Sequence, residues 1–413
     1  MDRVIMRNIS SLIGIQGMNF LIPLITLPYL VRVLEPSGYG VFGFATAVIQ
    51  YFCIFTDYGF NLSATQKASV TRYDKKNISQ LFWAVMVCKI LLCISGFLFL
   101  FALVNLVDQF REIKLVLYSS YGLVVGNLLF PIWLFQGKEF MGWIAISNIA
   151  ARLISIPLIF IFVIHKNDAW LAGMINGFSA ILAGLISLFI VYRKKWIYWS
   201  LPQFSQIIRE FKDGWHVFIS TAAISLYTTS TTVILGFIAG PISVGYFVAA
   251  DKIRQAIQGL ISPVSQAFYP RVNKLMSENK KLAFSLIRHL LLFLGGGALL
   301  TSLLLYFSAE ELIKLIYGES YQYSIDVLKI LACTPFIVAL SNIFGVQTLL
   351  VLGKKKTFSC ILVMAGIVSI LTLLPLSIYF QQNGAAFSVV MTEFTVSVAM
   401  FSYIVKSKIP LLK

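Results

Sequence analysis

Residues 79–105 read SQLFWAVMVCKILLCISGFLFLFALVN, a long apolar run interrupted by a single cation, Lys89. A transmembrane helix needs about 20 predominantly apolar residues, so this stretch predicts a membrane span. Eleven further stretches have the same character, at 8–31, 39–60, 114–135, 142–164, 169–192, 214–238, 243–269, 282–307, 324–352, 357–380 and 385–405. The runs are too long and too continuously apolar for a transmembrane β-barrel.

The composition excludes a purely soluble fold. Hydrophobic residues make up 58% of the chain and charged residues 12%, whereas soluble proteins have about 25% charged residues. We therefore predict an all-α polytopic membrane protein with about twelve transmembrane helices.

The net charge of +16 has a topological explanation. If the N-terminus is cytoplasmic, 22 of the 33 Lys and Arg residues fall in the inner segments and five in the outer loops. Cytoplasmic loops of membrane proteins carry such an excess of cations, and they face an anionic leaflet. This distribution predicts that both termini are cytoplasmic, and it argues against nucleic acid as a partner.

The spans divide into two sets of six. The longest connection, from Arg193 to Asp213, is basic and predicts a cytoplasmic linker at 196–213, between an N-terminal six-helix bundle at 1–195 and a C-terminal one at 214–413. The halves also resemble each other: a shift of 205 residues aligns Pro36, Gly40, Phe42 and Ala45 with Pro241, Gly245, Phe247 and Ala250. Internal repeats of this kind occur in transporters whose substrate site lies between the repeats, so we expect a central cavity between the bundles.

Motifs for catalysis, cofactors or metals are missing. Residues 38–43, GYGVFG, fit the dinucleotide pattern G-x-G-x-x-G, but that motif requires a preceding strand and a βαβ unit. Close packing of helices through small residues explains it better. Three histidines and five cysteines occur at no metal-like spacing. The sequence therefore predicts no enzyme, no cofactor and no metal site.

A polar stripe in the span at 243–269 is the strongest functional signal. Eight of its residues recur at helical spacing on one face, namely Asp251, Arg254, Gln255, Gln258, Ser262, Ser265, Gln266 and Tyr269. Hydrocarbon penalises such a face, so it must meet water or protein. We predict that it faces a hydrated cavity; the alternative is interhelical hydrogen bonding in a dry bundle.

Other ionisable or polar residues within spans extend the candidate site. As substrate-binding residues we predict Arg254, Lys252, Arg152, Gln255, Gln258 and Asn61, and as coupling or gating residues Asp251, Asp57 and Glu393. Arginine and lysine suit an anionic substrate, because guanidinium forms paired hydrogen bonds with phosphate. A carboxylate inside a span can carry a proton, bind a cation or hold a lysine.

Several strings resemble a known family. They are Leu27-Pro28-Tyr29-Leu30-Val31-Arg32, Tyr58-Gly59-Phe60-Asn61-Leu62-Ser63-Ala64-Thr65-Gln66, Pro131 to Glu139 and Leu235 to Asp251. The chain resembles, over essentially its whole length, the O-antigen (polysaccharide repeat-unit) flippases of Gram-negative bacteria. These belong to the multidrug/oligosaccharidyl-lipid/polysaccharide exporter superfamily.

The resemblance implies a function in lipopolysaccharide biosynthesis. An undecaprenyl-diphosphate-linked repeat unit would move by alternating access from the cytoplasmic to the periplasmic leaflet of the inner membrane. Partners would be this lipid-linked oligosaccharide, inner-membrane lipids and other polysaccharide assembly proteins. The alternative is an ion-coupled multidrug exporter of the same superfamily, which would favour a carboxylate-rich cavity. A polymerase or ligase would need a large periplasmic loop that the sequence lacks, and no selectivity-filter-like segment suggests a channel.

Overall fold

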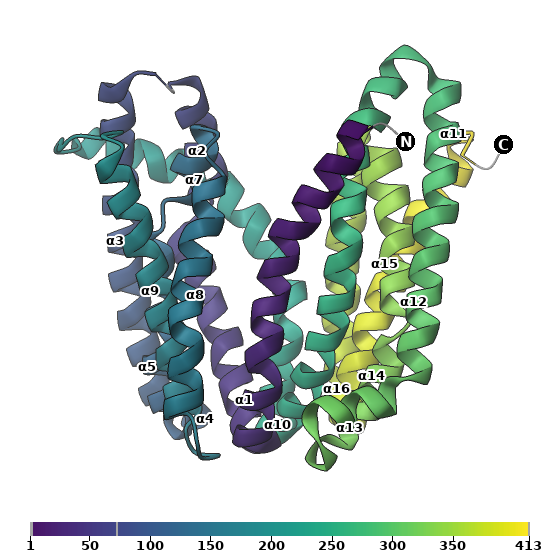
Figure 1. Ribbon diagram of the computed structural model, residues 1–413, viewed down its shortest axis with the longest axis horizontal. Helices are drawn as coiled ribbons and strands as arrows, with labels where there is room; N and C mark the ends of the chain where they lie inside the picture. Colours follow the sequence, from purple (N-terminus) through teal and green to yellow (C-terminus); the bar gives the residue numbers. More distant parts are fainter. Residues whose placement is uncertain (1–2, 72, 412–413) are drawn as a thin grey trace. The chain divides into compact units, whose positions relative to one another are not determined.

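Helices account for the described architecture (Figure 1). The computed structural model describes residues 3–71 and 73–411, and within the helices at 3–24, 220, 223, 224, 226–228, 260–264, 266 and 267 it describes the backbone only. In chain order the α-helices are α1 (Arg3–Asp57), α2 (Phe60–Val70), α3 (Lys75–Leu106), α4 (Asp108–Glu112), α5 (Lys114–Ser120), α6 (Gly122–Leu129), α7 (Ile132–Gly137), α8 (Gly142–Phe162), α9 (Ala169–Arg193), α10 (Phe204–Glu278), α11 (Lys280–Leu290), α12 (Gly296–Phe307), α13 (Ala309–Tyr317), α14 (Tyr323–Leu331), α15 (Thr334–Asn342) and α16 (Lys355–Lys406). Two π-helical segments, η1 (Leu291–Gly295) and η3 (Ile343–Leu350), and one 3-10 turn, η2 (Glu319–Tyr321), complete the set.

Each of the twelve predicted intervals falls on helical segments. Nine of the described helical stretches are long and apolar enough to cross a membrane. Two of these, Ile25–Val70 and Lys355–Lys406, are 46 and 52 residues long, more than one bilayer crossing requires. Large apolar side chains such as Leu98 and Phe162 are exposed on their surfaces, as expected where the solvent is lipid. The prediction of an all-α, multi-pass membrane protein is confirmed.

Three of the long helices contain a single non-helical residue. These are Glu35 in α1 (φ 56°, ψ 174°), Gly240 in α10 (φ 78°, ψ 176°) and Gln381 in α16 (φ 49°, ψ −126°). Glu35 and Gly240 have nearly the same backbone conformation, and each precedes a proline, Pro36 or Pro241. Their separation in sequence equals the 205-residue shift that aligns the two halves. The two halves therefore share a backbone conformation, and not only residue types, at this position of the predicted repeat.

Local sequence sets several helix starts. The Asp74 carboxylate accepts hydrogen bonds from the backbone N–H groups of Lys76 (2.9 Å) and Asn77 (3.1 Å), which begins α3. Asn279 caps α11 in the same way through the N–H of Leu282 (3.2 Å). Such caps satisfy N–H groups that have no partner within the helix.

Contacts divide the chain into two compact units. Unit 1 comprises residues 1–32 and 234–413, and unit 2 comprises residues 33–233. This division separates the first span from the residues that follow it and places it with the C-terminal spans. Residues 204–213 of the predicted linker already belong to α10. The bundle limits at 195 and 214, and a cavity between bundles, stay predictions.

Small residues pack the helices of unit 2 closely. Gly122 and Gly126 of α6 are four residues apart, as are Gly173 and Gly177 of α9. A Cβ atom on Gly122 would lie 2.9 Å from the Cα of Gly177, and one on Gly126 would lie 2.4 Å from the backbone of Ala180. This is the small-residue contact that membrane helices use in place of a hydrophobic driving force. Gly38, from the GYGVFG string, approaches the carbonyl of Lys166 in the same manner.

In unit 1 the core lies among α10, α11, η3 and α16. Ile287, Ile343, Ala365 and Met400 are buried there in one apolar cluster. Figure 1 shows α12 and α15 of this unit side by side. Val272 and Met276, near the end of α10, belong to the same apolar cluster.

Candidate functional site

Four residues of the predicted stripe form one hydrogen-bonded chain on α10. Nε of Arg254 donates to a carboxylate oxygen of Asp251 (2.6 Å), and Nη1 donates to Oε1 of Gln258 (2.6 Å). Nε2 of Gln255 donates to the second oxygen of Asp251 (2.6 Å). The spacings of three, four and seven residues place all four side chains on one helix face.

The ion pair in this cluster is mostly buried but not completely so. The Arg254 and Asp251 side chains are 13% and 16% exposed. An ion pair so placed has lost most of its hydration, and its hydrogen bonds must compensate for that loss. Arg254 therefore lies in a partly dehydrated environment.

Glu393, on α16, belongs to the same unit and is a second acidic residue in the neighbourhood of Arg254. The structure thus brings together Asp251, Arg254, Gln255, Gln258 and Glu393, five of the predicted residues. Lys252 is exposed, and its offset of two residues from Arg254 puts it on a different helix face.

Further along α10 the stripe meets protein. Oγ of Ser265 hydrogen-bonds to Oδ1 of Asn342 (2.5 Å), and Nε2 of Gln347 donates to the Ser265 carbonyl (2.8 Å). Ser265 and Gln347 are buried. At Ser265 the alternative of interhelical hydrogen bonding is therefore the correct one, whereas the side chains of Ser262 and Gln266 lie outside the described part.

The other predicted residues lie in unit 2. Asp57 accepts a hydrogen bond of 3.1 Å from Nζ of Lys89, whose side chain is only 1% exposed. Asn61 is the second residue of α2, and its buried Oδ1 has no hydrogen-bond partner among the described residues. Arg152 is partly buried in the middle of α8. These three residues and the Arg254 cluster therefore belong to different units.

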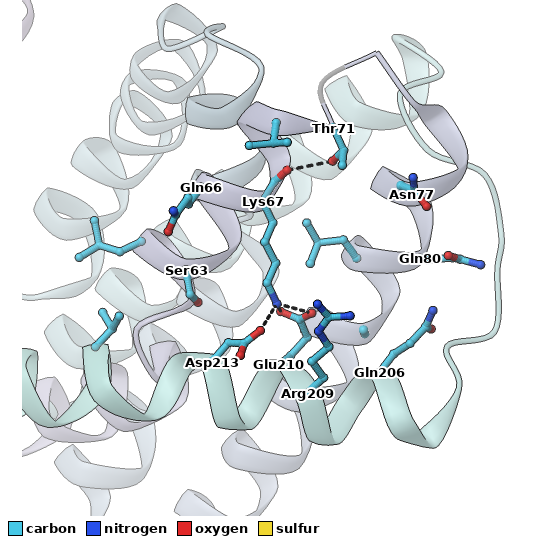
Figure 2. A pocket seen from close by; sticks show the side chains of 15 residues that line it. Ser63, Gln66, Lys67, Thr71, Asn77, Gln80, Gln206, Arg209, Glu210 and Asp213 are labelled. Atoms are coloured by element: carbon cyan, nitrogen blue, oxygen red, sulfur yellow. Dashed lines mark hydrogen bonds and ion pairs between the residues drawn. The ribbon is translucent and has the colours of Figure 1, made fainter.

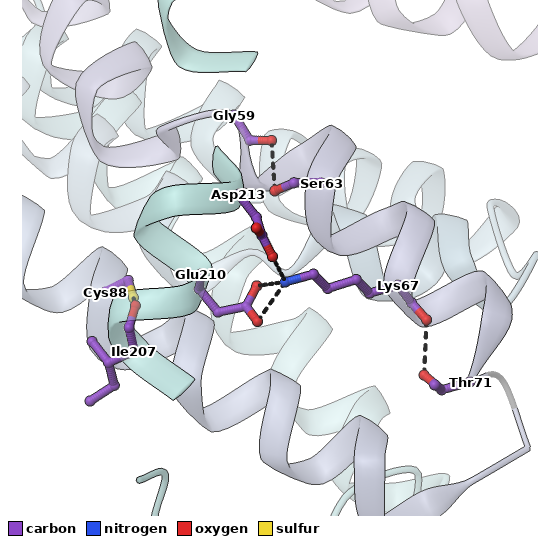
Figure 3. A network of polar contacts seen from close by, with 8 residues as sticks. All are labelled: Gly59, Ser63, Lys67, Thr71, Cys88, Ile207, Glu210 and Asp213. Carbon is purple, nitrogen blue, oxygen red and sulfur yellow. Dashed lines mark hydrogen bonds and ion pairs between the residues drawn. The ribbon is translucent and has the colours of Figure 1, made fainter. Parts of the chain in front are cut away.

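Sequence reasoning missed a second polar cluster in unit 2 (Figure 3). Nζ of Lys67 on α2 lies 2.7 Å from each carboxylate oxygen of Glu210 and 2.7 Å from Oδ2 of Asp213. Both carboxylates lie on the first turns of α10. The cation distribution places Lys67 on the cytoplasmic side. It does not reveal the acidic partners of Lys67, because they are more than 140 residues away in sequence. The signal in hindsight is two acidic residues, three apart, in a predicted linker that is otherwise basic.

Solved structures with the same fold are transporters. The chain matches the lipid II flippase MurJ in an inward closed conformation with a TM-score of 0.72 and 11% identity, over 96% of this chain and 87% of that one. It matches an inward-facing multidrug resistance MATE family transporter of the MOP superfamily with a TM-score of 0.71 and 13% identity, over 94% of each chain. Fold and apolar helices together define a multi-pass membrane protein with the fold of these two transporters.

The chain belongs to the polysaccharide biosynthesis protein family, whose sequence profile matches residues 5–276. It is 43% identical, over 98% of its own length and 97% of the other's, to an Escherichia coli (strain K12) protein named "Putative O-antigen transporter". The resemblance drawn from the sequence strings is confirmed. The transporter name of this relative agrees with the prediction that the chain is not an enzyme.

Proposed function

We propose that this protein flips a lipid-linked polysaccharide repeat unit, such as an O-antigen unit on undecaprenyl diphosphate, from the cytoplasmic to the periplasmic leaflet of the inner membrane. Both termini are cytoplasmic in this proposal, and transport follows alternating access. The partners are the lipid-linked oligosaccharide, the surrounding lipids and the other proteins of polysaccharide assembly. The observation that carries the proposal is the full-length similarity to an O-antigen transporter, together with a guanidinium held inside a span.

Fold alone does not choose between substrates. The TM-scores to a lipid II flippase and to a multidrug transporter are 0.72 and 0.71, too close to discriminate. The chemistry of Arg254 is more informative. A lipid-linked sugar diphosphate is anionic, and arginine is the side chain best suited to bind it because of its planar fork of donors.

In the proposed mechanism Arg254 holds the diphosphate and Asp251 controls its availability. The attraction between a phosphate and a guanidinium at 4 Å rises from about 1 kcal/mol in bulk water to about 4 kcal/mol at an effective dielectric of 20. A partly dry site therefore favours loading of the anion. Arg254 forms an ion pair with Asp251, and the same pair during the return step would leave no unpaired charge in the membrane.

Gln255 and Gln258 orient the pair and offer amide groups to the substrate. Each amide carries both donors and an acceptor. Arg152, Lys252 and Asn61 are further proposed contacts, and Asp57 and Glu393 are proposed coupling or gating residues. Glu393 lies in the neighbourhood of Arg254. A phosphate that binds Arg254 must therefore compete with the Asp251 and Glu393 carboxylates for this guanidinium.

The test uses a bacterial strain that lacks its own repeat-unit flippase, with surface polysaccharide as the readout and protein level checked by immunoblot. Arg254→Lys keeps the charge but loses the fork, so it should retain partial transport. Arg254→Gln should abolish most of it. Lys274→Gln is the matched control, because it removes an exposed cation from the same helix. Full complementation by Arg254→Gln would remove this residue from the mechanism.

The multidrug alternative makes a different prediction. An exporter of cationic drugs would keep its function when Arg254 is replaced by a neutral residue. It would lose its function when Asp251 or Glu393 is replaced by a neutral residue. Drug tolerance of a sensitive strain, measured with Arg254→Gln and Glu393→Gln, separates the two functions. Resistance that requires Glu393, without any rescue of surface polysaccharide, would favour the exporter.

A further inference from the structure

Unit 2 contains a pocket lined largely by polar residues, none of which belongs to the Arg254 cluster (Figure 2). It is formed by α2, α3 and the start of α10 and has a volume of about 610 Å³, within the range of about 300–1,000 Å³ typical of small-molecule sites. Lys67 and Glu210 meet at its floor. Its residues belong to segments that the cation distribution places on the cytoplasmic side.

The charges of this pocket cancel. Its charged lining residues are two cations, Lys67 and Arg209, and two carboxylates, Glu210 and Asp213. A free phosphate or a cationic drug would therefore meet no net charge of opposite sign in this pocket. A balanced pocket suits a neutral ligand that gains its affinity from hydrogen bonds.

The remaining polar lining is rich in amides and hydroxyls. Four primary amides and two hydroxyl groups line the pocket, from Gln66, Asn77, Gln80, Gln206, Ser63 and Thr71. Figure 2 shows Gln80 and Asn77 on the α3 side and Gln206 on the α10 side. Each amide presents donors and an acceptor, so the lining can match a ligand that carries many hydroxyl groups in a fixed arrangement.

Lys67 fixes the two carboxylates. The Glu210 side chain is only 8% exposed, and its two oxygens both lie 2.7 Å from the ammonium. Asp213 is 42% exposed and shares the same ammonium through one oxygen. A carboxylate has about four acceptor positions, so Asp213 keeps capacity to accept hydrogen bonds from a ligand while its own position is held.

We infer that this pocket binds a saccharide, namely the sugar part of the lipid-linked substrate, on the cytoplasmic side before transport. The inference rests on the proposed function and adds a second, uncharged recognition site to it. Sites built to hydrogen-bond hydroxyl groups discriminate strongly against ligands that lack them. The pocket would therefore select the glycan, whereas Arg254 would hold the diphosphate common to all such substrates.

Cysteine protection tests occupancy directly. Gln66→Cys and Gln80→Cys are made in a background where the exposed Cys333 and Cys360 are serine. Washed, inverted inner-membrane vesicles are prepared from cells that make lipid-linked repeat units and from cells that lack the enzyme starting their synthesis. A third sample is the second kind of vesicle supplied with the oligosaccharide released from the lipid by mild acid. Maleimide labelling rates are compared.

We expect slower labelling of both cysteines with the lipid-linked unit and with the released oligosaccharide. Ser205→Cys, exposed at the start of α10 and outside the pocket lining, is the matched control and should label equally in all samples. Equal rates at Gln66→Cys and Gln80→Cys throughout would overturn the inference. Protection by the lipid-linked unit alone would overturn the assignment to a saccharide.

Selectivity separates this inference from the proposed function. Gln66→Ala and Gln80→Ala are tested in two flippase-deficient strains that make different repeat units. Loss of one or two hydrogen bonds should reduce transport of the preferred unit by about two- to tenfold and change the ratio between the two units. Arg254→Gln should reduce both equally. Unchanged ratios with an intact Arg254 effect would reject the saccharide pocket alone, whereas failure of the parent protein to restore surface polysaccharide in either strain would reject the proposed function.

Discussion

The ammonium of Lys89 on α3 lies 3.1 Å from a carboxylate oxygen of Asp57 at the end of α1, with the lysine side chain 1% exposed. The same ammonium lies 3.5 Å from the carbonyl of Asn127 on α6. The pair therefore joins three helices of unit 2. A buried ion pair adds little net stability, but breaking it leaves an uncompensated charge.

The first prediction follows from that asymmetry. Asp57→Asn leaves the buried Lys89 ammonium without its counter-charge, so we expect a loss of about 3–5 kcal/mol in stability. The double change Asp57→Leu with Lys89→Met removes both charges and should be much less damaging. The measurement is thermal unfolding of the purified protein in detergent. A double variant no more stable than Asp57→Asn would show that the pair is needed for more than charge balance.

Transport assays on the same variants bear on the proposed coupling role of Asp57. If the double variant folds but does not complement a flippase-deficient strain, the carboxylate has a function beyond holding the lysine. Full transport by the folded double variant would assign the pair to structure alone.

The second prediction concerns backbone strain at Glu35. Its φ of 56° and ψ of 174° lie in a region that is essentially restricted to glycine and costs about 1–3 kcal/mol for other residues. The side chain compensates little, since its ion pair with Lys166 is 4.0 Å long and exposed. Glu35→Gly should therefore raise stability, by about 1 kcal/mol after the extra flexibility of glycine is counted.

Gly240, the position of the second half that is equivalent to Glu35, provides the opposite substitution as a control. Gly240 has the same backbone shape, and a Cβ there would meet nothing within 4 Å. Gly240→Ala should then destabilise the protein by about 1–2 kcal/mol through backbone strain alone. Opposite shifts in melting temperature for the two variants would support the strain argument, and shifts of the same sign would contradict it.

The third prediction tests the close approach of α6 and α9. A Cβ on Gly126 would lie 2.4 Å from the backbone and Cβ of Ala180, so Gly126→Ala must separate the helices. Overpacking of this kind costs about 1–3 kcal/mol. The matched control is Gly297→Ala in α12, where a Cβ has open space and alanine favours a helix by up to about 1 kcal/mol. Thermal unfolding should therefore rank Gly126→Ala below the parent protein and Gly297→Ala at or above it.

The fourth prediction concerns topology. The excess of cations in alternate segments places Lys195 and the C-terminal Lys413 in the cytoplasm. Phosphatase and fluorescent-protein fusions at both positions should report the cytoplasmic side. A periplasmic signal from either fusion would refute the predicted orientation, and with it the cytoplasmic placement of the Lys67 pocket.

Periodicity and hydropathy predicted the spans well because the bilayer imposes one rule on every helix. Each predicted interval falls on helical segments, and the predicted helix face holds Asp251 and Arg254, which form an ion pair. Breaks in the helices were harder to predict. Glu35 gives no sign of a positive φ, because nothing in its residue type favours that conformation.

Contacts distant in sequence could not be predicted at all. Nothing in the spacing links Lys67 to Glu210 or Lys89 to Asp57, and only the packing of helices reveals these pairs. The first four residues of the predicted stripe on α10 are hydrogen-bonded to one another on one helix face, but the stripe does not have the same surroundings along its whole length. Ser265 proved to be a packing contact because it lies opposite Asn342 and Gln347, two residues from another span.

The one-residue breaks in α1 and α10 also bear on how the chain enters the bilayer. Spans joined through Glu35 or through Gly240 are separated by a break of one residue, so we expect the second span of each pair to follow the first into the insertion machinery at once. For α10 this matters, because a charged residue near the centre of an isolated helix costs about 2.5–3.5 kcal/mol on insertion. The apolar segment before Gly240 would enter together with Asp251 and Arg254 and offset that cost. Residues 241–278 presented alone to the machinery should insert less efficiently than residues 204–278, which makes the break a feature of biogenesis as well as of the folded protein.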